Sequence, residues 1–379
     1  MTKLLEVKDL RTYFKVGLDK TAQAVDGVSF DIEQGKTLAI VGESGCGKTQ
    51  TAFSLIRLIA ENGFHPSGQI KFDGKNLSQL SEEEMRSLRG NDIAMIFQEP
   101  MTSLNPLYRI GNQLEEPLRQ HSKIAKGLAR IRAVELLNHV GIPDPDKRVD
   151  SFPHELSGGM KQRVMIAMAL ACKPKLLIAD EPTTALDVTI QAQVLRLMSD
   201  LQKETGMAIL LITHDMGIVN QMADDIAIMY AGRIVELGSR EIVFNNMAHP
   251  YTRRLFDSIP KPEDAGYLLN TIPGMVPGAT DYGEGCLFAD RCHEVMDICK
   301  STDGPKCTLN PGHITVCHLY DKGNHPTDER KAKRLPVPDR KLRSDSIVTI
   351  NSLSTWFPVR KGIFLRIANY VKAVDNVDM

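Results

Sequence analysis

Long apolar runs are missing from this 379-residue sequence. A helix needs about 20 consecutive apolar residues to cross a bilayer, and the most apolar stretches, Val164–Cys172 and Met207–Thr213, are much shorter. The first ten residues, MTKLLEVKDL, lack the apolar centre and the cleavage site of a secretory signal. We therefore expect a protein that stays inside the cell and works at a membrane only through a partner.

An excess of one charge is also missing. Lys and Arg number 46 against 47 Asp and Glu, which gives a formal net charge of −1. A protein that coats nucleic acid normally presents a basic surface, so this balance argues against that class. The length and the hydrophobic fraction of 42% suffice for a buried core and for two domains.

Strand-like and helix-like patterns alternate along the first part of the chain. Residues 1–35 alternate apolar and polar positions, which is the period of half-buried strands. The other predicted elements are strands around Gly68–Asp73, a strand at Thr37–Val41, a helix from Lys48 to Ala60, helical sequence over 81–140 interrupted at 98–106, a helix over Leu156–Cys172, buried parallel strands over Lys175–Ala179 and Ala208–Thr213, and a hairpin over Ile226–Glu236. This alternation predicts an α/β fold.

The end of the sequence repeats its beginning. VTINSLSTWF at Val348–Phe357 echoes LEVKDLRTYF at Leu5–Phe14, and Ala373–Val377 echoes Ala24–Val28. Between the two copies the composition changes near Pro250, where Pro, Gly and then Cys become frequent. An internal repeat of this kind predicts a second copy of the first domain beginning near Ser346.

A phosphate-binding loop is the strongest motif. Gly42 to Thr49 fits the pattern G-x-x-x-x-G-K-[ST] and lies between a predicted strand and a predicted helix, the context that the motif requires. Its N–H groups are expected to surround phosphates, Lys48 to reach the β- and γ-phosphates, and the Thr49 hydroxyl to ligate Mg²⁺. The predicted nucleotide-binding residues here are Gly42, Glu43, Ser44, Gly45, Cys46, Gly47, Lys48, Thr49 and Gln50.

Two acids follow a buried strand. Leu176–Ala179 is apolar and is followed directly by Asp180 and Glu181. An acid at the end of a strand beside a phosphate loop is placed to hold Mg²⁺, and the adjacent Glu181 is placed to act as general base on the attacking water. Together with the loop, this pair predicts a nucleoside triphosphatase.

The class is narrowed by Leu156-Ser157-Gly158-Gly159-Met160, which lies about twenty residues before the two acids. Here the chain resembles the nucleotide-binding domains of ABC transporters, whose signature is LSGGQ. The resemblance covers residues 4–257. Met160 departs from the usual Gln, as in the oligopeptide and dipeptide branch, while Ser157, Gly158 and Gly159 are kept.

The resemblance implies roles for further residues. Gln98 matches the glutamine that contacts Mg²⁺ and the attacking water, Ala185-Leu186-Asp187 matches the D-loop, and His214 matches the switch histidine that contacts the γ-phosphate. Phe14, or as the second choice Tyr13, matches the aromatic that stacks on adenine. The implied catalytic residues are Glu181, His214, Gln98 and Lys48, and the implied Mg²⁺ ligands are Thr49, Gln98 and Asp180.

The cysteine-rich stretch resembles the C-terminal extension of peptide-importer ATPases of the oligopeptide, dipeptide and nickel branch. The phrases that carry this are His249–Thr252, Gly285–Cys292 and Pro311–His318. Some relatives hold a [4Fe–4S] cluster here, which implies Cys286, Cys292, Cys299 and Cys317 as ligands and Cys307 as a non-ligand. The spacing fits neither ferredoxin nor zinc-knuckle rules, so zinc and metal-free thiols stay open.

The implied fold is an ABC-type P-loop NTPase with an antiparallel β subdomain, an α-helical subdomain and a Cys-rich extension. The predicted segments are an ABC ATPase domain over 1–257, the extension over 258–323, a charged linker over 324–345, and the start of a second, truncated ABC domain over 346–379.

The implied function is ATP hydrolysis, with ATP and Mg²⁺, that drives import of peptides or similar solutes. The expected partners are transmembrane permease subunits, a second ABC ATPase domain and, indirectly, a substrate-binding protein, at the cytoplasmic face of the inner membrane; no nucleic acid is expected. The alternative is a soluble ABC-type ATPase acting on nucleic acid or ribosomes. A third reading, ATP binding without hydrolysis, is disfavoured by Glu181 and His214. The solute itself cannot be inferred.

Overall fold

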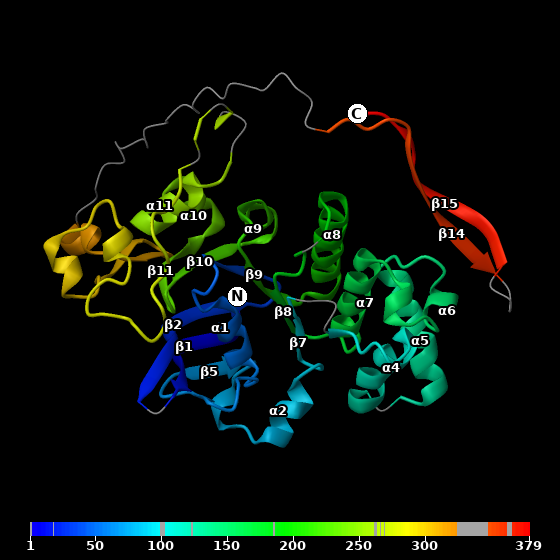
Figure 1. Cartoon of the computed structure of the whole chain (residues 1–379). Helices are drawn as coiled ribbons and strands as arrows, with labels where there is room; N and C mark the ends of the chain where they lie inside the picture. The colour runs from blue at the N-terminus through cyan, green and yellow to red at the C-terminus, as the bar shows by residue number, and fades with distance from the viewer. Residues whose placement is uncertain are drawn as a thin grey trace. The chain divides into compact units, whose positions relative to one another are not determined.

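The computed structural model describes residues 2–17, 19–98, 103–122, 124–184, 186–260, 264–265, 267–268, 270–323, 348–361 and 366–379. The chain forms two compact units (Figure 1). The first comprises Met1–Glu263 and Leu269–Lys333, and the second comprises Asp264–Leu268 and Arg334–Met379. The predicted linker over 324–345 lies outside the described residues. Among the described helices, none is both long enough and apolar enough to span a bilayer.

A mixed sheet forms the centre of the first unit. Within the described residues it has eight strands in the order β12-β13-β11-β10-β3-β9-β8-β7. The strands from β10 to β7 run parallel to their neighbours, and those from β10 to β12 are antiparallel. Their bounds are β3 Thr37–Val41, β7 Ile93–Ile96, β8 Leu176–Asp180, β9 Ala208–Thr213, β10 Asp225–Tyr230, β11 Arg233–Ser239, β12 Lys306–Asn310 and β13 His313–Val316.

Three of these strands are buried along their whole length. Every residue of β3, β8 and β9 is buried, because both faces of a parallel sheet are covered. The predictions of a strand at Thr37–Val41 and of central parallel strands over 175–179 and 208–213 are confirmed, as is the hairpin over 226–236.

The N-terminal strands belong to a second, antiparallel sheet. It has the order β2-β1-β5-β6, and β4 pairs with β1. The bounds are β1 Lys3–Val16, β2 Lys20–Glu33, β4 Gly63–Phe64, β5 Gln69–Phe72 and β6 Lys75–Asn76. Alternation in the main sheet divides the core: Leu38 and Ile40 of β3 pack toward this second sheet, whereas Ala39 and Val41 pack toward the helices.

The helices surround these sheets, and Figure 1 shows α4 to α6 on the side opposite β1 and β2. Their bounds are α1 Lys48–Leu55, α2 Glu82–Leu88, α4 Ile110–His121, α5 Lys126–His139, α6 Pro145–Arg148, α7 Gly158–Leu170, α8 Val188–Thr205, α9 Met216–Met222, α10 Arg240–Asn245 and α11 Pro250–Asp257. The helix predicted to Ala60 ends at Leu55, since Arg57 adopts a left-handed φ of 53°.

One prediction in this region is wrong. The stretch 81–140 was expected to be helical except at 98–106, but Ile93–Ile96 forms strand β7 beside β8. Four residues are too few to show the period of a strand against charged helical neighbours. Burial on both faces beside β8 decides the structure here: Ile93, at 2% exposure, lies in the core toward the second sheet, and Ile96, at 1%, lies in the core toward the helices.

The extension after α11 is built from short elements. It contains the 3₁₀ turns η4 (Ala289–Arg291), η5 (Asp297–Lys300) and η6 (His318–Gly323), with β12 and β13. Strand β13 pairs with β11, so the extension continues the main sheet. A buried hydrogen bond between His313 Nε2 and Glu236 Oε1, at 2.9 Å, reinforces that junction.

In the described part of the second unit there is one hairpin. Strand β14 (Leu353–Lys361) pairs antiparallel with β15 (Arg366–Val377). This is the segment in which the sequence repeats its N-terminus. A second domain beginning near Ser346 stays a prediction.

Candidate nucleotide-binding site

The predicted phosphate loop joins two buried elements. It leaves β3 after Val41 and enters α1 at Lys48. Gly47 has a φ of 104°, and a Cβ atom there would lie 2.3 Å from the carbonyl oxygen of Ala24, so only glycine fits. The Lys48 side chain is 6% exposed, and its Nζ donates to the carbonyl oxygens of Gly42 at 2.8 Å and Glu43 at 3.0 Å. The loop is thereby closed on its own lysine.

The other predicted loop residues differ in exposure. Ser44 and Gly45 are exposed, Glu43, Thr49 and Gln50 are half-buried, and Cys46 is buried. Burial raises the pKa of the Cys46 thiol. Cys46 is therefore a packing residue under the loop rather than a reactive thiolate.

Asp180 ends strand β8 and is 1% exposed. Burial raises its pKa, although a hydrogen bond with Thr49 opposes that shift. Its Oδ1 is buried without a hydrogen-bond partner. A buried carboxylate oxygen with no protein donor, next to a threonine hydroxyl, is suited to hard-cation binding, so the residues present fit Mg²⁺.

Glu181 is surrounded by the residues that the sequence assigns to catalysis. Its Oε2 accepts a hydrogen bond from Gln98 Nε2 at 3.1 Å and one from the Thr184 hydroxyl at 3.0 Å. Its Oε1 lies 3.1 Å from His214 Nδ1. Burial alone would raise the pKa of Glu181, but the hydrogen bonds with His214 and Thr184 outweigh it and hold the pKa below its usual value. The carboxylate is therefore ionised at neutral pH.

Sheet order explains why these residues meet. Strand β9 pairs with β3 on one side and with β8 on the other. His214 directly follows β9, so it lies between the phosphate loop after β3 and the acids after β8. The carboxyl ends of the three parallel strands share one edge, where α/β sheets bind ligands.

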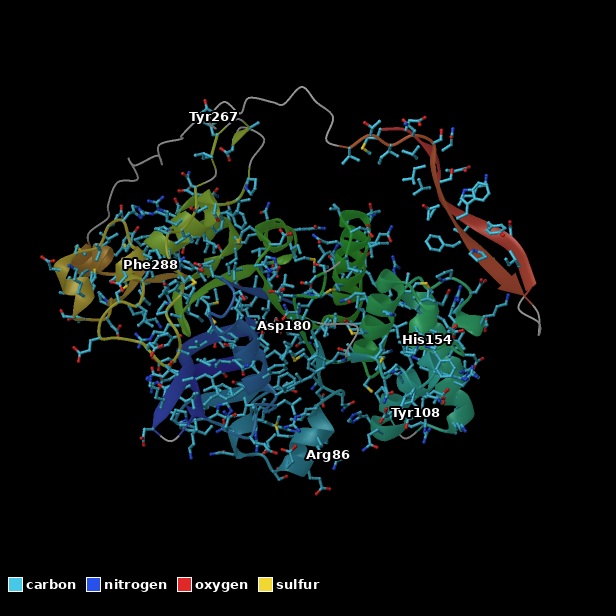
Figure 2. All side chains as sticks on the ribbon, viewed as in Figure 1. Arg86, Tyr108, His154, Asp180, Tyr267 and Phe288 are labelled. Carbon is cyan, nitrogen blue, oxygen red and sulfur yellow. The ribbon has the colours of Figure 1, made fainter. Side chains whose placement is uncertain are left out.

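The signature residues lie elsewhere in the first unit. Ser157 caps α7 by accepting from the Met160 N–H at 3.3 Å, and both Ser157 and Gly158 are exposed. Gly159 is half-buried against Ile190. Figure 2 labels His154, next to this segment, on the helical side and well away from Asp180. The fold thus brings Gln98, Glu181 and His214 together, and it leaves Ser157 and Gly158 exposed at the start of α7.

A buried side chain connects the signature helix to the acids. Gln162 of α7 is 1% exposed, and its Nε2 donates to the carbonyl oxygen of Pro182. The predicted D-loop lies just beyond, where Asp187 caps α8 by accepting from the Ile190 N–H at 2.9 Å. Ala185 of that motif lies outside the described residues, as do residues 99–102 directly after Gln98.

The two candidate adenine-stacking aromatics have different surroundings. The Tyr13 hydroxyl donates to Asp26 Oδ1 at 2.7 Å, and burial raises its pKa to about 12. Phe14 is half-buried and pairs with Gly63 of β4. Because Tyr13 is held by Asp26, the geometry favours Phe14, which stays the predicted residue.

Four of the five clustered cysteines converge. Cys286, Cys292, Cys299 and Cys317 line one cavity of about 20 Å³ together with Phe288. Burial raises the pKa of Cys292 to about 11 and that of Cys317 to about 12. Cys307 lies on β12, and its Sγ contacts the carbonyl oxygen of Pro305 instead. Among the described residues, no group of three His, Cys, Asp or Glu is arranged to hold a metal ion.

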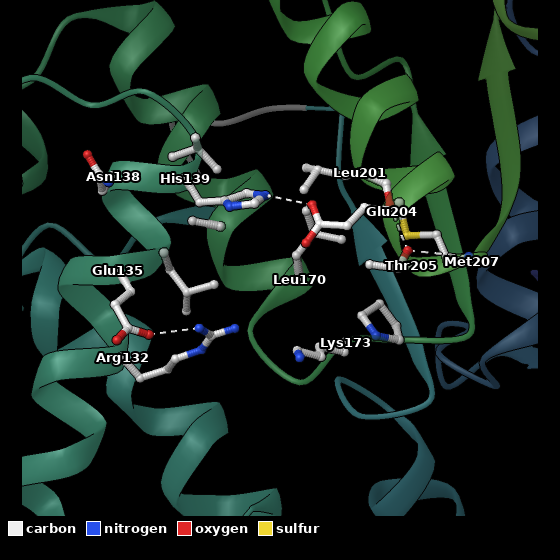
Figure 3. A pocket seen from close by; sticks show the side chains of 14 residues that line it. Arg132, Glu135, Asn138, His139, Leu170, Lys173, Leu201, Glu204, Thr205 and Met207 are labelled. Carbon is white, nitrogen blue, oxygen red and sulfur yellow. Dashed lines mark hydrogen bonds and ion pairs between the residues drawn. The ribbon is translucent and has the colours of Figure 1, made fainter.

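A separate cleft of about 380 Å³ lies between α5 and the C-terminal end of α8 (Figure 3). His139 Nε2 on one wall is 3.4 Å from Glu204 Oε2 on the other, and Arg132 pairs with Glu135 at 2.8 Å. None of the predicted nucleotide-binding residues lines it. The cleft is therefore separate from the predicted nucleotide-binding residues.

Some contacts of the site were not predicted from sequence. Thr184 binds Glu181 three residues away, and a hydroxyl at that spacing after two acids was a signal that could have been used. Tyr251 and Arg291 both contact Glu43 of the phosphate loop. Arg291 is 248 positions from Glu43, so no local pattern indicates their contact.

The sheet order, with a strand ending in His214 inserted between the loop strand and the acid-bearing strand, and a signature helix on a separate helical part, defines an ABC-type P-loop ATPase. Comparison with known families agrees. Residues 25–184 match the ABC transporter family. Residues 235–299 match the oligopeptide/dipeptide transporter C-terminal region.

Individual relatives are similar over most of their length. A putative peptide import ATP-binding protein of Brucella melitensis is 50% identical over 83% of this chain and 96% of its own. The oligopeptide transport ATP-binding protein OppD of Bacillus subtilis is 52% identical over 84% and 89%. The dipeptide transport ATP-binding protein DppD of Escherichia coli is 46% identical over 86% and 99%.

Among solved structures, the dimeric ATP-binding cassette MJ0796 bound to ADP and Pi matches with a TM-score of 0.56 and 26% identity, covering 62% of this chain and 98% of that one. The chain therefore belongs to the oligopeptide/dipeptide family of ABC transporter ATP-binding proteins, and it is an ABC ATPase.

Proposed function

We propose that this chain hydrolyses ATP to energise import of peptides or similar small solutes through membrane permease subunits. The names of its relatives support the peptide class. The single observation that carries the chemistry is the position of Glu181, ionised and held by Gln98 and His214 at the sheet edge beside the phosphate loop. None of the comparisons supports action on nucleic acid or ribosomes.

The residues of the nucleotide site have different roles in hydrolysis. The loop N–H groups and Lys48 bind the phosphates, and Thr49, Gln98 and Asp180 would hold Mg²⁺, which when bound screens the phosphate charge. Glu181 accepts the proton of the attacking water as that water approaches the γ-phosphorus, and His214 contacts the γ-phosphate. Because Glu181 has a lowered pKa, it is in the base form without further activation.

The exposed signature residues are expected to bind a partner domain. Ser157–Gly159 of one domain would cover the phosphates bound by Gly42–Thr49 of another, as expected for head-to-tail dimers of this class. The dimeric state of the similar cassette MJ0796 supports this arrangement. The partner would be a second ABC ATPase domain, and the repeated hairpin supports a copy in the same chain. Such dimers would attach to the permease at the cytoplasmic face of the inner membrane, with the substrate-binding protein on the far side.

Three variants test this proposal. Glu181→Gln should bind ATP normally, lose turnover by about 10²–10⁴-fold, and trap a closed dimer with its partner domain. Lys48→Ala should lose ATP affinity. Glu204→Gln, which changes a carboxylate of the separate cleft, should hydrolyse ATP like the wild type. Wild-type turnover by Glu181→Gln would contradict the assigned base.

We also propose that Cys286, Cys292, Cys299 and Cys317 form a metal site, with a [4Fe–4S] cluster as the first candidate and zinc as the second. Their convergence on one cavity supports this, and thiolate sulfur is the donor that both groups prefer. Binding would require the side chains to move, because among the described residues no three such groups are placed to hold a metal ion. Iron and zinc analysis with visible absorbance of anaerobically purified protein tests it, and a metal-free protein without that absorbance would refute it.

A further inference from the structure

One residue of the phosphate loop is fixed at three points. The Glu43 N–H donates to the Tyr251 hydroxyl at 2.9 Å, its carbonyl oxygen accepts from Lys48 at 3.0 Å, and its carboxylate accepts from Arg291 at 3.1 and 2.9 Å. Only Lys48 belongs to the loop itself. Tyr251 lies in the first turn of α11, and Arg291 ends the turn η4 of the extension.

Two further hydrogen bonds hold the Arg291 guanidinium in place. Its Nε donates to the carbonyl oxygen of Pro273 at 2.8 Å, and its Nη1 donates to the Tyr230 hydroxyl at 3.3 Å. The side chain is 6% exposed. A buried guanidinium with several acceptors loses little further freedom when it binds a carboxylate through two nitrogens.

An acid in a phosphate loop is unfavourable for the ligand. A carboxylate close to a triphosphate repels it, and the repulsion grows where the site is partly shielded from water. Glu43 is half-buried, so its charge needs a permanent partner. The bidentate bond both neutralises the charge and directs the carboxylate toward the extension.

We propose, on the basis of the nucleotide site proposed above, that Arg291 is a positioning residue of that site: the extension neutralises Glu43 and so sets the affinity of the phosphate loop for ATP. The same turn connects the loop with the thiols, because η4 lies between Cys286 and Cys292. Phe288 of that segment lines the cysteine cavity and also packs on Tyr230 and Tyr251, with ring centroids 5.2 and 5.4 Å apart.

The test is ATP affinity, measured by equilibrium binding to the full chain with MgATP. Arg291→Gln should weaken binding about tenfold, which is the effect of losing one charge-assisted interaction. The double variant Glu43→Gln with Arg291→Gln should recover most of that loss, because no carboxylate is left to repel the phosphates. Arg253→Gln is the matched control: Arg253 joins α11 to Glu294 and Tyr320 of the extension, and its loss should leave ATP affinity unchanged.

A second pair of variants does not depend on changing the extension. Glu43→Asp keeps the charge but withdraws it from Arg291, so binding should weaken about tenfold, whereas Glu43→Gln removes the charge and should bind ATP more tightly than Glu43→Asp. In turnover assays, Arg291→Gln should raise KM for ATP and leave kcat nearly unchanged, since the interaction is the same in ground and transition states.

Equal affinity of Arg291→Gln and Arg253→Gln would overturn the proposal. So would equal affinity of Glu43→Asp and Glu43→Gln, or a double variant as weak as Arg291→Gln alone, which would indicate a folding defect. Failure of the wild-type chain to bind ATP would instead overturn the proposed function, and this inference with it.

Discussion

The hairpin of β1 and β2 and the hairpin of β14 and β15 have the same pairing but different environments. In the first, Leu10 pairs with Val28. In the second, Leu353 pairs with Val377, at the positions that the sequence repeat makes equivalent. Left-handed residues also recur, at Asp9 and Gly27 in the first hairpin and at Ser352 and Asn376 in the second.

Even a side-chain bond is repeated. Tyr13 donates to Asp26 at 2.7 Å, and Trp356 donates to Asp375 at 3.1 Å. Burial is what differs: Leu10 is 1% exposed and Leu353 is 44% exposed. The comparison teaches that register, bulges and cross-strand bonds are set within about thirty residues. The burial of the first hairpin comes from its packing with β5, α1 and the main sheet.

The largest expected difference concerns the two equivalent leucines. Leu10→Ala should lower the unfolding free energy of the first unit by about 3 kcal/mol, because it leaves a cavity in the core. Leu353→Ala should change it by less than about 0.5 kcal/mol. Urea denaturation followed by circular dichroism measures both, and Trp356, the single Trp of the chain, reports separately on the second hairpin. Similar losses in the two variants would show that the second hairpin is buried too.

The repeated aspartates should differ next. Asp26 also receives bonds from Arg11 at 3.0 Å and Arg233 at 2.9 Å, and its side chain is 11% exposed. Asp26→Asn should therefore cost about 2 kcal/mol in unfolding free energy. Asp375→Asn, at a position where the side chain is 45% exposed, should be indistinguishable from wild type in the same urea titration. A silent Asp26→Asn would show that these three bonds add nothing to stability.

The acid dependence of stability should distinguish the wild type from Asp26→Asn. Burial raises the pKa of Asp26, but the bonds with Tyr13 and Arg233 outweigh it and hold the pKa below its ordinary value of 3.8. Stability from a depressed carboxyl pKa is fully present above the unfolded value and is lost as pH falls through the folded one. Unfolding free energy should therefore fall more steeply below about pH 4 in the wild type than in Asp26→Asn. Parallel acid profiles would contradict this.

The smallest effect is expected at the repeated bulge. Gly27 has a φ of 75° and Asn376 a φ of 54°, and a Cβ at Gly27 would meet Asp9 Oδ1 at an ordinary 3.5 Å. Gly27→Asn should cost less than about 1 kcal/mol, since Asn tolerates this conformation better than most residues. Gly27→Val is the control and should cost clearly more in thermal unfolding. Equal costs would show that contacts, not backbone conformation, decide this position.

The sequence was sufficient for features that are encoded locally. Three features can be recognised within about fifteen residues each. Glycine spacing indicates the phosphate loop, an apolar run indicates the strand before Asp180, and a capping residue indicates the helix after Ser157. The meeting of Gln98, Glu181 and His214 was predicted only through family resemblance, because it depends on β9 lying between β3 and β8.

Contacts between distant segments were not predictable. Strand β7 has only four residues, and it forms because it pairs with β8 and is buried there. Strand β13 joins the main sheet through two pairs with β11, and Arg291 reaches Glu43 from the other end of the unit. In each of these cases the partner lies far along the chain, where periodicity carries no information.

The bond from Gln162 to Pro182 has a mechanical consequence. Both groups are buried, so neither can exchange its partner for water without an energetic cost. A rotation of the helix that carries the signature must therefore drag the peptide immediately after Glu181 or break this bond. A change in the tilt of α7 would therefore be passed to the backbone beside the Glu181 carboxylate.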